Sequence, residues 1–121
     1  MRDFDTWRKI SIAYKPTIIS YSKSEKFPYG IANVLRLYCA PGYPAQTEGI
    51  FKNIELRWYG FSDHTIGIDA ARIALARGAQ IIEKHFVLYF DKDFPDNSWS
   101  MTPDDLKELV RWEGVCQSVL Q

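Results

Sequence analysis

Apolar residues of this chain fall into four short runs with strand character, each bounded by polar or turn-forming residues. β-Branched and aromatic side chains dominate these runs, as is typical of strands that lie in a sheet. The runs occupy residues 17–20, 34–39, 56–61 and 81–86. The pattern therefore predicts four strands, and it predicts a loop at 21–33, where Pro28 and Gly30 interrupt the chain and no helical period is present.

Two further stretches have the period of an amphipathic helix. The first runs from about 66 to 77, with Thr65 as its expected N-terminal cap and Gly78 as its expected stop. The second begins after Thr102, with Pro103 at the first helical position. Because the first helix joins two strands, those strands are expected to be parallel neighbours in a β/α unit.

Alternation along the last two strands decides which polar side chains face together. Glu83 and His85 share one face of the fourth strand, while Lys84 takes the other. Ser62 and His64 likewise share one face of the third strand. Two histidines, a serine and a glutamate can therefore converge at the carboxyl ends of adjacent strands, which is where β/α barrels carry their active sites.

The predicted fold class is α/β, a partial TIM-type (β/α) barrel of about four parallel strands with two clear helices. A closed barrel needs eight strands, so residues 1–121 are expected to form a single domain equivalent to half a barrel, with an open sheet as the alternative. Open strand edges and uncovered apolar faces then favour a homodimer or a complex with an N-terminal half-barrel chain. Candidates for the covered surface are Trp7, Trp58, Trp99 and Trp112.

Composition excludes several function classes. Lys plus Arg and Asp plus Glu each number 15, so the formal net charge is zero, which gives no support to nucleic-acid or membrane binding. No apolar run approaches the roughly 18 residues of a membrane span, and the N-terminus lacks an apolar signal-peptide segment. Cys39 and Cys116 are far apart in sequence and are expected to be buried thiols of a cytoplasmic protein.

Five motifs occur in an order that points to a known family. They are Lys15-Pro16-Thr17-Ile18-Ile19-Ser20, Tyr38-Cys39 with Tyr43-Pro44-Ala45, Gly60-Phe61-Ser62-Asp63-His64-Thr65, Ile82-Glu83-Lys84-His85-Phe86, and Phe94-Pro95-Asp96 with Ser100-Met101-Thr102-Pro103-Asp104-Asp105-Leu106. Over roughly 15–109 the chain resembles the C-terminal half of the catalytic barrel of the N-acetylneuraminate (sialic acid) synthases. The pairing of Ser-Asp-His-Thr with Glu-Lys-His-Phe at this separation is a specific signal.

The resemblance implies a transferase of carbohydrate (nonulosonic acid) biosynthesis. Family members condense phosphoenolpyruvate with a 2-acetamido sugar aldehyde such as N-acetylmannosamine and release phosphate, using a divalent metal that is usually manganese, with magnesium as the alternative. By resemblance, His64 and His85 are the expected metal ligands. Glu83, on the same strand face as His85, is the expected partner for proton transfer.

The remaining site residues are also implied by the resemblance. Lys15, Ser20 and Ser62 match positions that hold the phosphate of phosphoenolpyruvate, and Tyr43 and Asp96 match positions that contact the sugar.

The sequence also departs from the family, and this leaves two functional hypotheses open. After Ser20 the family usually continues with Thr-Gly-Met, whereas this chain has Tyr21, Ser22 and Lys23, so the glycine that lets backbone amides approach phosphate is missing. The family's first four β/α units and its C-terminal antifreeze-like domain have no counterpart in the motifs. The chain is therefore either an enzyme that acts together with a second half-barrel, or a non-catalytic module for assembly or sugar binding.

Overall fold

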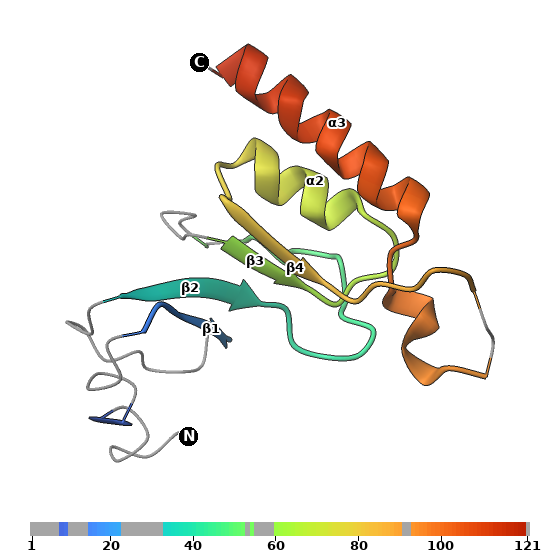
Figure 1. Cartoon of the computed structure of the whole chain (residues 1–121), viewed down its shortest axis with the longest axis horizontal. Coiled ribbons are helices and arrows are strands. Elements are labelled where there is room, and N and C mark those ends of the chain that lie inside the picture. Colours follow the sequence, from blue (N-terminus) through green and yellow to red (C-terminus); the bar gives the residue numbers. More distant parts are fainter. Residues whose placement is uncertain are drawn as a thin grey trace.

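Four parallel strands form the centre of the fold in the computed structural model, which describes residues 8–9, 15–22, 33–52, 54, 60–90 and 93–120. The strand order in the sheet is β1-β2-β3-β4. Their bounds are β1 Thr17–Tyr21, β2 Val34–Cys39, β3 Gly60–Asp63 and β4 Ile81–Lys84. The strands all run in the same direction, so their carboxyl ends meet at one edge of the sheet (Figure 1). The α/β fold with four parallel strands, predicted from the sequence, is confirmed.

The predicted strands agree with the structure to within a few residues. β2 has the predicted bounds, and β1 is one residue longer than predicted. β3 continues beyond the predicted end to Asp63, while predicted positions 56–59 lie outside the described residues. β4 ends at Lys84, and Phe86 makes only an isolated bridge with Met101. Both histidines therefore follow directly after the last residue of a strand.

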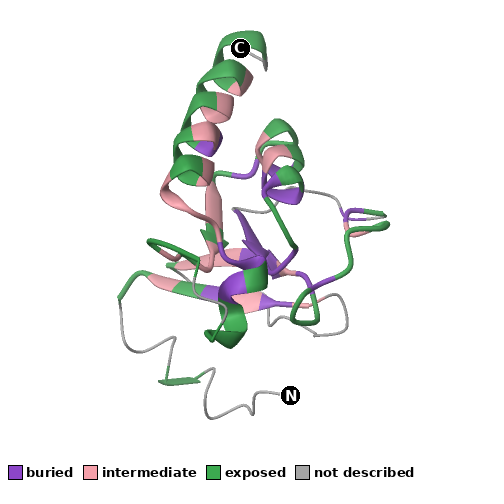
Figure 2. Cartoon of the chain, turned by 90° about the vertical axis from the view of Figure 1, so that its right-hand side faces the viewer, coloured by how far each residue is buried: buried purple, intermediate pink, exposed green. Residues whose placement is uncertain are grey.

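Two helices cover one face of the sheet, and a short 3-10 helix lies near its carboxyl edge (Figures 1 and 2). They are α2 Asp69–Ala76, α3 Pro103–Leu120 and the 3-10 helix η1 Pro95–Trp99. α2 follows β3 and α3 follows β4, as predicted. Within the described part of the chain, no helix is both long enough and apolar enough to cross a bilayer.

α2 begins three residues later than predicted, at Asp69 instead of Ile66. Gly67 has a φ of 73°, which a right-handed helix cannot include, and the N-cap position falls to Ile68. Thr65 does not cap the helix, because it lies three residues before the N-cap position, and its hydroxyl donates to Asp63. The predicted stop is confirmed, since Gly78 has a φ of 90°. The backbone N–H of Gly78 donates to the carbonyl of Leu75, and that of Ala79 donates to the carbonyl of Ala74, which ends the helix.

A reciprocal cap fixes the start of α3, as predicted. The Thr102 hydroxyl lies 3.3 Å from the backbone N–H of Asp105, and the backbone N–H of Thr102 donates to Asp105 Oδ2 at 2.8 Å. The hydrogen bond from this backbone N–H lowers the pKa of Asp105 below its usual value. The indole N–H of Trp112 donates to the carbonyl of Arg72 at 3.0 Å, so Trp112 joins α3 to α2.

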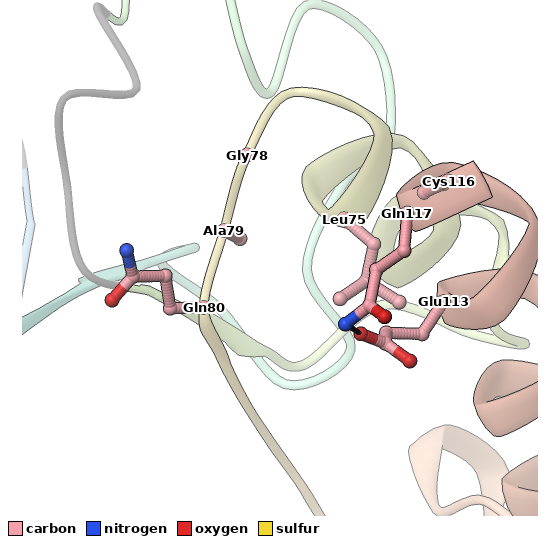
Figure 3. Close-up of a pocket in the computed structure, with 7 residues that line it drawn as sticks. All are labelled: Leu75, Gly78, Ala79, Gln80, Glu113, Cys116 and Gln117. Atoms are coloured by element: carbon pink, nitrogen blue, oxygen red, sulfur yellow. Dashed lines mark hydrogen bonds between the residues drawn. The ribbon is translucent and has the colours of Figure 1, made fainter. Parts of the chain in front are cut away.

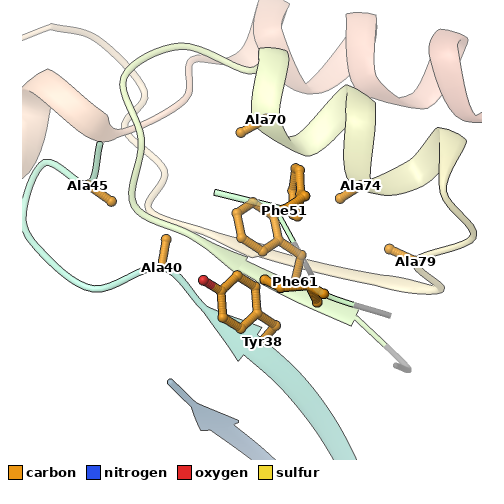
Figure 4. Packing of buried hydrophobic residues seen from close by; sticks show 9 residues of the cluster. Tyr38, Ala40, Ala45, Phe51, Phe61, Ala70, Ala74 and Ala79 are labelled. Atoms are coloured by element: carbon orange, nitrogen blue, oxygen red, sulfur yellow. The ribbon is translucent and has the colours of Figure 1, made fainter. Parts of the chain in front are cut away.

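The hydrophobic core lies between the sheet and α2 (Figure 4). Phe61 is fully buried in the middle of this layer, stacked on Tyr38 and in edge contact with Phe51. Ala70 and Ala74 present only small side chains to the sheet, so α2 can approach it closely. The free thiols of Cys39 and Cys116 are half-buried, which corrects the expectation that both are buried.

The opposite face of the sheet is much less covered. Ile18, which points to that face from β1, is 57% exposed. A run of apolar side chains after β4 is also exposed, including Leu88 and Tyr89. β1 and β4 are the outer strands of the described sheet. The described part of the chain therefore has exposed apolar surface on the face opposite the helices and in the segment after β4.

One pocket lies away from both histidines. It is formed where the turn from α2 into β4 meets α3, and its lining includes Leu75, Gln80, Glu113 and Cys116 (Figure 3). Because this turn precedes β4, the pocket lies at the amino-terminal end of that strand. The candidate site described next is at the carboxyl end.

Candidate functional site

Polar side chains gather near the carboxyl ends of the strands on the face of the sheet that the helices do not cover. This face is called the concave face below. Ser62 and Glu83 are register partners on β3 and β4. Ser20 on β1 donates a hydrogen bond of 2.8 Å to Glu83 Oε2. β1 and β4 are not neighbours in the sheet, so this bond spans the concave face and requires the sheet to curve as a barrel wall does. Ser62 and Glu83 thus share one face of the sheet, as the alternation along the strands predicts, and Ser20 contacts Glu83 from β1.

His64 is buried directly after β3, and its ring is held on one side by the main chain. Its Nδ1 lies 3.3 Å from the carbonyl oxygen of Ala40 and 3.8 Å from the thiol of Cys39. A carbonyl oxygen can only accept, so the proton of a hydrogen bond to Ala40 resides on Nδ1. The lone pair of Nε2 then remains available for a ligand.

His85 is arranged in a similar way directly after β4. Its Nδ1 lies 3.3 Å from Oδ2 of Asp96, which comes from η1. Its backbone carbonyl accepts a hydrogen bond of 2.8 Å from the backbone N–H of Met101. A neutral His85 ring that donates from Nδ1 to this carboxylate leaves the lone pair of Nε2 for a ligand. Asp96, expected from the sequence to contact a sugar, therefore lies against His85.

Aromatic rings enclose the two histidines. Tyr43 stacks on His64 with 4.2 Å between ring centroids, and it presents an edge to His85 and to Trp99. Trp99 also meets His85 edge-on at 6.2 Å. Tyr43 is 62% exposed and forms the outer wall, whereas Trp99 is only 8% exposed and forms the inner one.

Sequence reasoning missed Trp99 as a site residue and placed it among candidates for an interface. The available signal was its spacing from Asp96. In a 3-10 helix residues i and i+3 lie on the same side, and both Asp96 and Trp99 approach His85 from η1. Trp7 and Trp58, the other two interface candidates besides Trp112, lie outside the described residues.

Lys15 stands apart from the other candidates. It is exposed and precedes the first residue of β1, with its carbonyl accepting a hydrogen bond from the Thr17 hydroxyl. Ser20 lies five residues further along, near the carboxyl end of the same strand, about 16 Å away at the usual rise of a strand. The structure therefore does not bring the Lys15 side chain together with Ser20 and Ser62.

The two histidine rings have a spacing that suits a shared metal ion. Their centroids are 5.6 Å apart and their planes are inclined at 74°. A metal bound to both Nε2 atoms at about 2.1 Å would hold the centroids about 4.6 Å apart at a right angle and about 5.3 Å apart at a tetrahedral angle. Within the described residues there is no group of three or more His, Cys, Asp or Glu side chains placed to hold a metal. His64 and His85 would therefore supply two ligands, leaving the others to water, substrate or a partner.

The four parallel strands and the helices that follow β3 and β4 define this protein as part of a (β/α) barrel, and the candidate site lies at the carboxyl ends of the strands. The chain belongs to the NeuB family, whose model matches residues 28–119. It is 34% identical over 93 residues to the N,N'-diacetyllegionaminic acid synthase of Legionella pneumophila, covering 69% of this chain and 26% of that protein. It is 35% identical over 95 residues to the pseudaminic acid synthase of Helicobacter pylori, covering 73% and 27%.

The fold also matches a solved member of this group. The crystal structure of the N-acetylneuraminic acid (sialic acid) synthetase of Leptospira borgpetersenii aligns with a TM-score of 0.76 at 22% identity, over 96% of this chain and 46% of that one. The family resemblance inferred from the motifs is thus confirmed. The chain spans about a quarter of the length of the curated relatives it matches.

Proposed function

We propose that this chain provides the second half of a synthase barrel that condenses phosphoenolpyruvate with a 2-acetamido sugar aldehyde and releases phosphate. The observation that carries the proposal is the pair of histidines at the ends of adjacent strands, each with Nδ1 beside an oxygen acceptor, which leaves Nε2 of a neutral ring for a ligand. The relatives named as legionaminic and pseudaminic acid synthases support this substrate class.

The proposed reaction forms one carbon–carbon bond and one carbon–oxygen bond to water, and it breaks the carbon–oxygen bond to phosphate. The enol carbon of phosphoenolpyruvate attacks the aldehyde carbon, and the aldehyde oxygen takes up a proton from solvent to become a hydroxyl. Water adds to the cationic carbon that carries the phosphate ester, and it loses one proton to a base. The bond between that carbon and the phosphate oxygen then breaks while the new hydroxyl gives its proton to the departing phosphate, which leaves a keto acid and inorganic phosphate.

Residues of this chain would hold the aldehyde and the attacking water. A divalent metal held by His64 and His85, manganese or alternatively magnesium, would supply Lewis-acid polarisation of the aldehyde oxygen. Glu83 lies on the same face and would accept the proton of the attacking water. Ser20 already donates to Glu83 and so fixes the carboxylate that would act as the base.

The other candidates would bind the two substrates. Ser62, buried on the concave face, would donate its hydroxyl proton to the phosphate. Ser20 has one hydroxyl proton, so it would donate to the phosphate only by turning away from Glu83. Tyr43 would pack against the sugar. Asp96 would contact a sugar hydroxyl and would also keep the His85 ring oriented. Lys15 is not part of this proposal because it stands at the other end of β1.

A second candidate function is a non-catalytic one, as an assembly or sugar-binding module. It is favoured by the separation of Lys15 from the serines and by the presence of only two grouped metal ligands in the described part of the chain. The two candidates differ in whether the His64–His85 pair binds metal and supports phosphate release.

Phosphate release from phosphoenolpyruvate separates the two. We expect release with manganese and N-acetylmannosamine, by the chain itself or after addition of a separately produced first half-barrel. Substitution His85→Ala should lower the rate by at least about a hundredfold, the scale on which a single electrostatic contact to a transition state acts. Lys107→Ala, on the exposed face of α3, is the matched control and should leave the rate unchanged. Absence of both release and manganese binding under all these conditions would refute the enzyme proposal.

We also propose that the uncovered concave face is closed by a second copy of this chain or by an N-terminal half-barrel chain. Four strands supply half of the eight that a closed barrel needs, and β1 and β4 are the outer strands of the described sheet, with all described strands parallel. Light scattering of the isolated chain should therefore give twice the 14.0 kDa of the monomer, or the mass of a complex when the other half is present. A monomer at micromolar concentration, with the other half present and unbound, would contradict the proposal.

A further inference from the structure

A buried ion pair lies directly behind the two histidines, on the helix-covered face of the sheet. Lys84 Nζ lies 3.1 Å from Asp63 Oδ2, and both side chains are fully buried. The pair is tied to Thr65 on both sides. Asp63 Oδ1 accepts hydrogen bonds of 2.8 Å from the backbone N–H and the hydroxyl of Thr65, and Lys84 donates to the Thr65 carbonyl at 2.8 Å.

The position of this pair in the sheet relates it to both histidines. Asp63 and Lys84 are register partners and are the last residues of β3 and β4. The residue that follows each of them is a histidine, and the pairing between β3 and β4 ends just before it. Lys84 binds Asp63 and Thr65, the two residues on either side of His64. Lys84 is also the residue directly before His85. The network therefore links the backbones that carry the two rings.

Stability alone is a poor reason for such a pair. Removing two charges from water costs much of what their attraction provides, and a well-packed apolar pair is often as stable. The apolar cluster beside it, with Ile82 and Phe61, shows that this layer of the fold otherwise uses apolar residues. An ion pair with defined hydrogen-bond geometry does what an apolar pair does not, since it fixes the relative position of the two strand ends.

We propose that the Asp63–Lys84 pair, together with Thr65, is a positioning element that sets the separation and orientation of His64 and His85. It contacts neither substrate nor metal and acts only through the backbones of the two histidines. The inference deepens the proposed function, on which its consequence for metal binding rests. The placement of the rings, by contrast, can be measured without metal.

The test is the double substitution Asp63→Asn with Lys84→Met in the full chain. Either single change leaves a buried charge without its partner, whereas the double change removes both charges and nearly keeps the shape of the side chains. We expect a folded protein whose manganese dissociation constant rises at least about tenfold, the scale seen when outer partners of metal ligands are lost. The nuclear Overhauser contact between the His64 and His85 rings in metal-free protein should weaken or disappear.

The exposed pair Lys107–Asp104 on α3 provides the matched control. Its atoms lie 2.9 Å apart, but the side chains are largely exposed and far along the chain from both histidines. The double substitution Asp104→Asn with Lys107→Met should change neither readout. Should Asp63→Asn/Lys84→Met fail to fold, Thr65→Val is the second variant, since it removes only the hydroxyl bonded to Asp63. This variant should also weaken the nuclear Overhauser contact between the His64 and His85 rings.

The outcomes separate this inference from the proposed function. A folded Asp63→Asn/Lys84→Met variant, or a folded Thr65→Val variant if that one is needed, with an unchanged ring contact would overturn the positioning role. A wild-type protein that shows the ring contact but binds no manganese would refute the proposed metal site, and loss of the contact in the variant would still support positioning.

Discussion

Replacing Phe61 with alanine is expected to lower the free energy of unfolding by about 3 to 5 kcal/mol, the range for loss of a fully buried aromatic ring. Phe61 has no exposed surface, and its ring meets Phe51 edge-on at 5.0 Å and stacks on Tyr38 at 6.0 Å. It sits on β3 opposite Ala70 and Ala74, which are too small to fill the space (Figure 4). Denaturant unfolding followed by circular dichroism measures the effect.

Two further variants make the Phe61 result specific. Phe61→Leu keeps most of the apolar volume and should cost less than about 1.5 kcal/mol. Phe94→Ala removes the same ring from a site that is 63% exposed and should change stability by no more than about 0.5 kcal/mol. Similar losses for Phe61→Ala and Phe94→Ala would show that the layer between the sheet and α2 is not the core of the folded chain.

Adding one methyl group at Gly60 should be as damaging as removing a ring from Phe61. A Cβ at Gly60 would lie 2.3 Å from the carbonyl oxygen of Ile81 and 2.5 Å from Cδ2 of Leu37. Ile81 and Leu37 are its register partners on the strands at either side, so the overlap involves backbone that cannot turn away. We expect Gly60→Ala to lower stability by at least about 3 kcal/mol, the upper end for overpacking, as measured by thermal or denaturant unfolding.

Gly114→Ala is the matched control for this substitution. Gly114 lies within α3, and a Cβ there would meet nothing within 4 Å. The same added methyl should therefore raise stability by about 0.5 to 1 kcal/mol, because alanine favours the helix more than glycine does. A Gly60→Ala variant as stable as the parent protein would mean that β3 and β4 do not pair closely at this point.

Much of the fold followed from local pattern. The strand bounds at β2 and the stop at Gly78 depend on residues close in sequence, and they were predicted correctly. The predicted start of α2 was wrong because Gly67 has a positive φ, which moves the N-cap to Ile68. Thr65 instead binds Asp63, which is itself held by Lys84 from the next strand. Neither the backbone angle of Gly67 nor this contact between strands can be read from the local pattern.

The candidate site divides in the same way. The sequence alone determined which residue types occur at the strand ends, and which of them share a face, because the side-chain period of a strand is fixed by its backbone. Only the tertiary structure decided the distances between them. Curvature of the sheet brings Ser20 to Glu83 from two strands that are not neighbours, and the loop after β2 places Tyr43 on His64.

Long-range contacts explain what could not be predicted. Asp96 reaches His85 because η1 folds back over the end of β4, which depends on the course of a loop and not on any period. Lys15 and Ser20 are close in sequence yet lie toward opposite ends of β1, because an extended strand separates residues by about 3.3 Å each. Local sequence determined the chemical groups of this protein, and packing of distant segments determined which of those groups meet.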